Sequence, residues 1–95
     1  PVNDGKLIRV ILPSLTTERR RELTKVLHEK LENARVSLRK VRQEVREFIE
    51  AEEESKSISE DVKFKLFEDL EEKVKEYNSK IKDIGDNKEA EINTI

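Results

Sequence analysis

Four arginines in the first half of the chain have a spacing that is suited to chemistry with a charged partner. They are Arg35, Arg39, Arg42 and Arg46, at successive steps of four, three and four residues. On an α-helix this spacing places the four side chains within an arc of roughly 60°, over a rise of about 16 Å. Guanidinium groups are planar, permanently charged and able to donate paired hydrogen bonds. This arginine stripe therefore suits the phosphate backbone of a nucleic acid.

The same arginines also fit a purely structural role. Like charges four residues apart oppose a helix by roughly a few tenths of a kcal/mol, so carboxylates outside this helix are expected to compensate them. If the chain folds back near Lys56, Arg42 comes close to Glu71 and Glu72. Because runs of charge usually mark solvated or salt-bridged faces, the spacing alone favours this second interpretation.

The sequence contains no group of residues typical of a catalytic or metal site. It has one histidine, no cysteine and two separated glycines, and its acids are spread along predicted helix faces. An enzyme needs convergent nucleophiles, acids or bases, so we expect no catalytic residues and no enzymatic activity. Because His28 has no second imidazole or thiolate to join it, we also expect no metal site and no cofactor. His28 is interpreted as a surface or core-edge residue beside Leu27 and Leu31.

The composition limits the architecture and the location of the protein. Of the 95 residues, 44% are charged and 34% are hydrophobic, which favours long, thin helices over a thick globular core. No apolar run approaches the roughly 20 residues that span a bilayer, and no segment resembles a signal peptide. We therefore expect a soluble protein without a membrane partner, located in the cytoplasm or in an organellar matrix or stroma.

Periodic apolar residues predict one long helix over residues 16–56, which contain no Gly or Pro. Thr16 or Thr17 is a suitable N-cap, with Glu18 in the first turn. The apolar residues of the predicted seam alternate steps of four and three, as in a heptad pattern. They are Leu27, Leu31, Ala34, Leu38, Val41, Val45 and Phe48, with Leu23, Val26 and Ile49 on the flank.

A second helix is predicted after a restart at residues 57–61, where Ser59 can cap or Ser57 and Glu60 can form a capping box. The segment 85–87, Gly-Asp-Asn, is either its end or a weak point, because a helical pattern resumes at Lys88. Its apolar seam is made of Leu66, Phe67, Leu70, Val74, Tyr77, Ile81 and Ile84.

Together these patterns predict an all-α fold, a long antiparallel αα-hairpin over 16–95 preceded by a short extended segment within 1–15. The β-branched run 7–12 has strand length and is ended by Pro13. Two helices with one seam each leave apolar surface in water. We therefore expect a third helix or self-association to cover it.

Several motifs resemble the carboxy-terminal half of the ribosome recycling factor family, in that family's order and spacing. They are Ile8-Arg9-Val10, Leu12-Pro13-Ser14-Leu15-Thr16, Glu18-Arg19-Arg20, Ala34-Arg35-Val36, Arg39, Val41-Arg42, Ile58-Ser59-Glu60-Asp61 and Lys88-Glu89-Ala90-Glu91-Ile92. The resemblance covers nearly the whole chain. It implies the last strand of a β domain and a hinge at Pro13, Ser14 and Leu15, followed by the second and third helices of a three-helix bundle.

The resemblance also implies a function. Members of this family work with elongation factor G to split ribosomes after termination, and arginines of the second helix contact rRNA of the large subunit. Arg35, Arg39 and Arg42 match those positions, whereas Arg46 is included from its spacing alone. The chain is thus expected to bind large-subunit rRNA and, without the first helix, to form a homodimer that has no recycling activity of its own. The alternative is a helical-hairpin interaction or oligomerisation module whose arginines only form salt bridges within the chain.

Overall fold

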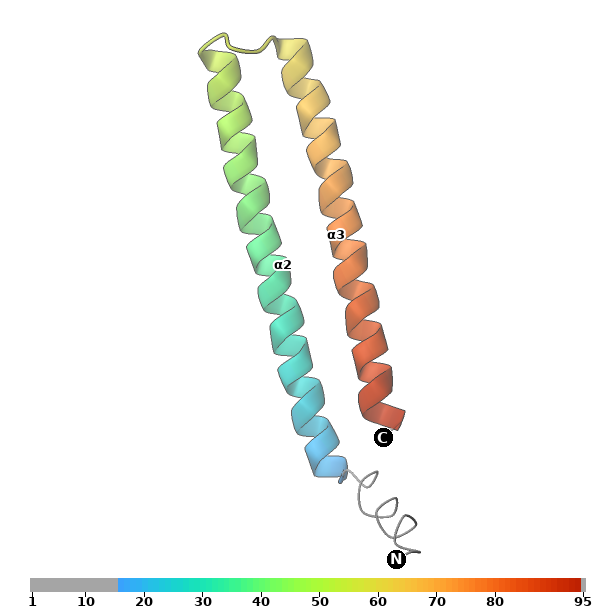
Figure 1. Ribbon diagram of the computed structural model, residues 1–95. Coiled ribbons are helices and arrows are strands. Elements are labelled where there is room, and N and C mark those ends of the chain that lie inside the picture. The colour runs from blue at the N-terminus through green and yellow to red at the C-terminus, as the bar shows by residue number, and fades with distance from the viewer. Residues whose placement is uncertain (1–15, 95) are drawn as a thin grey trace, which may run out of the picture.

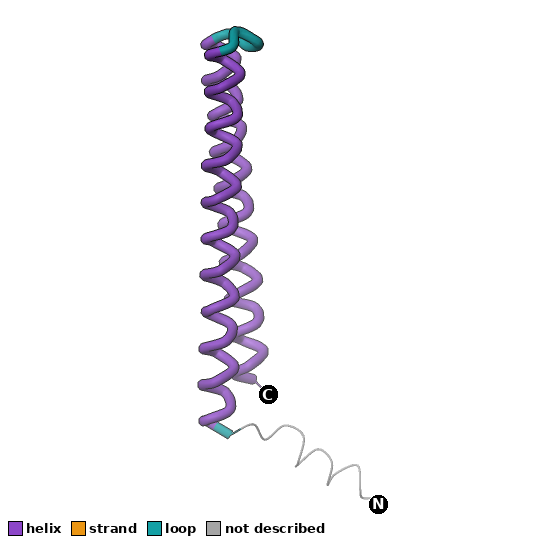
Figure 2. The backbone as a smooth tube through the Cα atoms, turned by 90° about the vertical axis from the view of Figure 1, so that its left-hand side faces the viewer, coloured by secondary structure: helices purple, strands orange, loops and turns teal. Residues whose placement is uncertain are grey.

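The computed structural model describes residues 16–94, which form two long helices joined by a short connection (Figure 1). Helix α2 spans Thr17–Glu54 and helix α3 spans Glu60–Thr94. The two helices run antiparallel side by side, and a view turned by 90° shows a hairpin one helix thick (Figure 2). The predicted all-α hairpin is confirmed. The predicted strand at 7–12 and the predicted hinge at 13–15 lie outside the described residues.

Helix α2 begins at the N-cap that the sequence predicts. Thr16 has an extended backbone, and its Oγ1 accepts a hydrogen bond of 2.9 Å from the backbone N–H of Arg19. Glu18 lies in the first turn, where a negative charge is stabilised by the positive end of the helix dipole. The cap satisfies one of the backbone donors that a helix start leaves without a partner.

Helix α2 ends in a Schellman motif rather than by fraying. The backbone N–H of Lys56 donates to the carbonyl of Glu53 at 3.0 Å, and that of Ser57 donates to the carbonyl of Glu52 at 2.9 Å. Lys56 adopts the left-handed conformation that this motif requires, with a φ of 65°. Glycine usually occupies this position because a side chain strains it. This turn reverses the chain within five residues, so the two helices become neighbours.

Helix α3 is capped by Ser59, the residue before its start, whose Oγ accepts a hydrogen bond of 3.2 Å from the backbone N–H of Val62. The helix continues through Gly85, so the segment 85–87 is neither an end nor a break. Gly85 is buried against α2, and a Cβ atom there would lie 2.6 Å from Leu31 Cδ1. The glycine therefore allows close approach of the two helices rather than ending α3.

The seam between the helices is shifted from the one that the apolar pattern predicts. Leu27, Leu31, Ala34, Leu38 and Val45 are half-buried as predicted. Val41 and Phe48 were expected in the seam but are 53% and 58% exposed, whereas Ile49, expected on the flank, is only 7% exposed. The apolar stripe on α2 is wider than one partner helix can cover. Contact with α3 therefore selects one edge of it, and the other edge stays in water.

Candidate nucleic-acid interface

Antiparallel packing gives the hairpin two different faces. Both helices are right-handed and run in opposite directions. On each helix, some residues point inward to the other helix. The residue that precedes an inward residue in the chain points to the same side of the hairpin on both helices, and the residue that follows it points to the other side. The first side is the apolar face, made of Val26, Val41, Phe48, Leu66, Tyr77 and Ile84, each exposed by 37% or more. The second side carries the arginine stripe.

Arg42 and Arg46 converge on a single carboxylate of α3. Arg42 Nε donates to Glu71 Oε1 at 2.6 Å, and Arg46 Nη1 lies 4.0 Å from the same oxygen. The guanidinium of Arg46 also lies over the ring of Phe67, 4.2 Å from its centroid. The hydrogen bond from Arg42, with the charges of both arginines, lowers the pKa of the Glu71 carboxyl below its usual range. This half of the stripe is thus tied to the partner helix. The structural interpretation predicts both Glu71 and Glu72 near Arg42, and of these two Glu71 forms the ion pair.

Arg35 and Arg39 are held differently, by an acid of their own helix. Arg35 Nη1 lies 3.6 Å from Glu32 Oε1, and Arg39 Nη2 donates to Glu32 Oε2 at 3.4 Å. The expectation that acids outside α2 compensate this pair is therefore wrong, because Glu32 lies within one or two turns of both. The side chain of Arg39 is 66% exposed, against 36% for Arg42 and 30% for Arg46. The Arg35 and Arg39 half of the stripe is the more accessible to a ligand.

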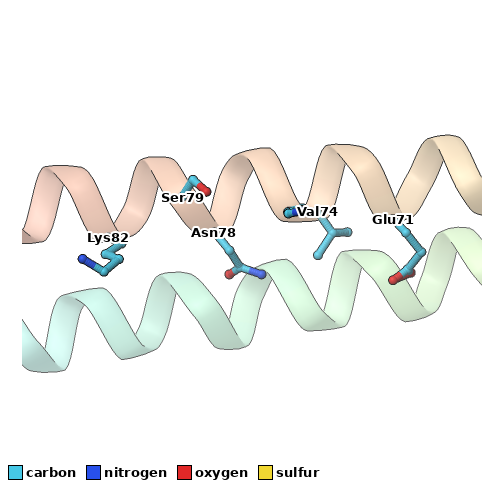
Figure 3. A pocket seen from close by; sticks show the side chains of 6 residues that line it. Glu71, Val74, Asn78, Ser79 and Lys82 are labelled. Atoms are coloured by element: carbon cyan, nitrogen blue, oxygen red, sulfur yellow. The ribbon is translucent and has the colours of Figure 1, made fainter.

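An open groove runs along α3 and is lined by residues of that helix (Figure 3). Glu71, Asn78 and Lys82 extend from α3 toward α2 along it, and Lys75 also lines it. Because Glu71 contacts two members of the arginine stripe, the groove and the stripe lie on the same side of the hairpin. The side therefore combines cations from both helices.

His28 and the acids form no further site in residues 16–94. Nε2 of His28 lies 3.2 Å from Glu89 Oε1 on α3, which places this exposed histidine at the edge of the helix contact. Within the described range, no group of three or more His, Cys, Asp or Glu side chains is arranged to hold a metal ion. Neither of the two described helices is long and apolar enough to cross a membrane.

Comparison with known proteins identifies the family. The sequence matches the family model described as ribosome recycling factor over residues 1–92. The chain belongs to the ribosome recycling factor family. A relative from Aquifex aeolicus, named ribosome-recycling factor, is 44% identical over 95 residues, which are 100% of this chain and 50% of the relative. A relative of the same name from Syntrophomonas wolfei is 41% identical over 92 residues, covering 97% of this chain and 50% of the relative.

The chain thus spans about half the length of the curated ribosome-recycling factors that it matches. No solved structure is matched. Membership of the family agrees with the resemblance found in the motifs. The two-helix fold agrees with the bundle helices that the resemblance implies.

Sequence reasoning missed Glu32, Lys75 and Lys82 as parts of this surface. Glu32 precedes Arg35 by three residues and Arg39 by seven, a helical spacing that predicts contact. The lysines follow Glu71 by four and eleven residues, which also places them on its side of α3. The spacing was available in the sequence. The side of α3 that faces the arginines became known only from the fold.

Proposed function

We propose that this chain binds rRNA of the large ribosomal subunit through the arginine stripe, as part of a recycling factor that splits post-termination ribosomes with elongation factor G. The observation that carries the proposal is the alignment of four guanidinium groups on one side of α2, in a chain of the ribosome recycling factor family. The first and last arginines of the arginine stripe are about 16 Å apart along α2. This length is enough to contact several successive phosphates of an RNA strand.

The carboxylates that hold the arginines do not prevent phosphate binding. The ion pairs lie at the surface, where each is weak because water screens both charges. A phosphate can accept two parallel hydrogen bonds from a guanidinium and can replace a carboxylate in that role. In the absence of RNA, Glu32 and Glu71 keep the arginine side chains extended along one side of α2. The proposed action is mechanical: the helices anchor on rRNA, and motion about a hinge at residues 13–15 transmits force without bond chemistry.

A second function is favoured by one observation, the short contact between Arg42 and Glu71. In this alternative, the hairpin is an interaction or oligomerisation module whose arginines serve only to join its own helices. Arg39 argues against it, because its side chain is mostly in water and its acid partner belongs to the same helix. An arginine that only joined the two helices would lie against α3.

Co-sedimentation with large ribosomal subunits across a salt series tests the proposal. We expect the wild-type chain to bind and its affinity to fall steeply with salt, because binding to phosphates releases counterions. The double variant Arg39→Glu, Arg42→Glu should lose binding while circular dichroism shows unchanged helicity. Lys30→Glu with Lys40→Glu is the matched control, since it makes the same charge change on other sides of α2.

Two outcomes would contradict the proposal. If the wild-type chain does not bind large subunits at low salt, the proposal that it binds their rRNA is wrong. Loss of helicity in the arginine variant, with normal helicity in the lysine control, would instead support the alternative in which the arginines hold the hairpin together.

We also propose that a second copy of the chain covers the apolar face. Ile49 is the one hydrophobic side chain in the described range that the hairpin buries, while the apolar face leaves six large residues exposed. Two hairpins that pack with their apolar faces together form a four-helix bundle, and both apolar faces are then buried. Sedimentation equilibrium should give the mass of a dimer, and Phe48→Glu should shift it to that of a monomer. A wild-type monomer at high protein concentration would refute the dimer.

A further inference from the structure

The row of residues on α3 that borders the groove has the same spacing as the arginine stripe. Glu71, Lys75, Asn78 and Lys82 follow at steps of four, three and four residues. On the α-helix they fall within an arc of roughly 60°, like the arginines of α2. We call this row the α3 stripe. Two rows of equal length, one on each helix, therefore line the same side of the hairpin.

The contacts between the helices fix how the two rows are aligned. Arg42 meets Glu71, and Leu31 meets Gly85. Because the helices are antiparallel, residue numbers increase along α3 from the Glu71 contact to the Gly85 contact and decrease along α2 in the same direction. Lys75, one turn beyond Glu71, is then level with the turn of α2 that precedes Arg42, which carries Arg39. Asn78 and Lys82 continue along the turns that carry Arg35 and the residues before it.

The charges of the groove change along its length. At one end Glu71 is occupied by Arg42 and Arg46. One turn further, Lys75 is exposed and has no carboxylate within 4.0 Å among residues 16–94. Lys82 Nζ is 2.8 Å from Asp86, and its side chain is 73% exposed. An anion is therefore best placed beyond Glu71, between the mostly exposed Arg39 and the unpaired Lys75.

We propose that Lys75 and Lys82 bind RNA phosphates together with Arg35 and Arg39, so that the RNA backbone lies across both helices, over the groove on α3 and the arginine stripe, rather than on α2 alone. This inference rests on the proposed function, since it names the second row of the same site. Cations from two helices can hold a backbone from both sides, and the amide of Asn78 can donate a hydrogen bond to a phosphate or sugar oxygen between them. Glu71 closes one end of the groove by repelling a further phosphate.

The test is the double variant Lys75→Gln, Lys82→Gln in the co-sedimentation assay with large ribosomal subunits. Its matched control is Lys73→Gln with Lys80→Gln, which removes the same charge from the opposite side of α3. A lysine that meets a phosphate contributes a salt exponent of about one. We therefore expect roughly ten- to thirty-fold weaker binding near 0.15 M salt for the first variant and a shallower salt dependence. The control should bind like the wild-type chain.

Three results would overturn the inference, and they are distinguishable. If the variant binds like the wild-type chain while Arg39→Glu with Arg42→Glu does not bind, the groove proposal fails and the arginine stripe stands. If the variant and its control weaken equally, net charge rather than position is responsible, and the groove proposal also fails. If the wild-type chain does not bind at all, the proposed function fails and the groove proposal with it.

Discussion

The contact between Gly85 and Leu31 allows a quantitative test of the hairpin. Replacing Gly85 by alanine has two opposite effects on the free energy of unfolding. Alanine is favoured over glycine within a helix by about 1 kcal/mol. The new Cβ, however, would lie 2.6 Å from Leu31 Cδ1 and 3.2 Å from Cδ2. Crowding of this kind costs about 1–3 kcal/mol when the neighbours cannot move.

The surroundings of Leu31 decide the size of that cost. The crowded atoms are the ends of a flexible side chain, and Leu31 is only half-buried, so it can rotate toward water. We therefore expect a cost near the lower limit, about 1 kcal/mol, which roughly cancels the gain in helix propensity. In a Leu31→Ala background the crowding disappears. There Gly85→Ala should stabilise the hairpin by about 1 kcal/mol.

Urea unfolding followed by far-ultraviolet circular dichroism measures all four proteins of this double-mutant cycle. The proteins must be compared at one concentration, because association adds to apparent stability. The expected coupling between the two sites is about 1 kcal/mol, since neighbouring residues are not additive. Equal stabilisation by Gly85→Ala in both backgrounds would refute the reasoning. It would mean that Gly85 does not pack against α2 and only weakens α3.

Substitutions at three further positions test the ion pair and the helix ends. Glu71→Gln should strengthen binding to large subunits, because it frees Arg42. In thermal unfolding at neutral pH, the wild-type chain should be more stable than this variant. The pKa of the Glu71 carboxyl is lowered in the folded chain, so the stability that its carboxylate contributes is lost as the pH falls through that lowered pKa. The difference in stability between the two proteins should therefore vanish on acidification. Lys56→Gly should raise the stability to urea by about 0.5–1 kcal/mol, since it removes side-chain strain at a φ of 65°, and Lys56→Ala should not. Thr16→Ala should lower that stability by about 1 kcal/mol through loss of the hydrogen bond to the N–H of Arg19, whereas Thr16→Ser should keep most of it.

The amino-acid sequence determined the helices and most of their ends. Side chains repeat around a helix with a fixed period, so spacing alone placed the four arginines on one side of α2. Caps are equally local, because Thr16 and Ser59 bond to backbone groups three residues away. The turn at Lys56 was less evident, since a residue other than glycine adopts the left-handed conformation there.

Only the tertiary structure decided which edge of each helix faces the other. The apolar stripe of α2 is wide enough for two neighbours, so its pattern could not tell whether Val41 or Arg42 would point toward α3. Neighbouring residues point about 100° apart around a helix, so this difference of one residue decides which side of α2 faces α3. It turns Phe48 to water, buries Ile49 and brings Glu71 to the arginines.

The same packing gave Gly85 its role. In the sequence a glycine followed by Asp and Asn is typical of a helix end, because glycine lacks a Cβ and disfavours the helix. In the hairpin that missing Cβ is the space into which Leu31 packs. A local pattern describes what a segment does alone. The partner helix determined that α3 continues and that lysines and arginines far apart in the chain lie on one side of the hairpin.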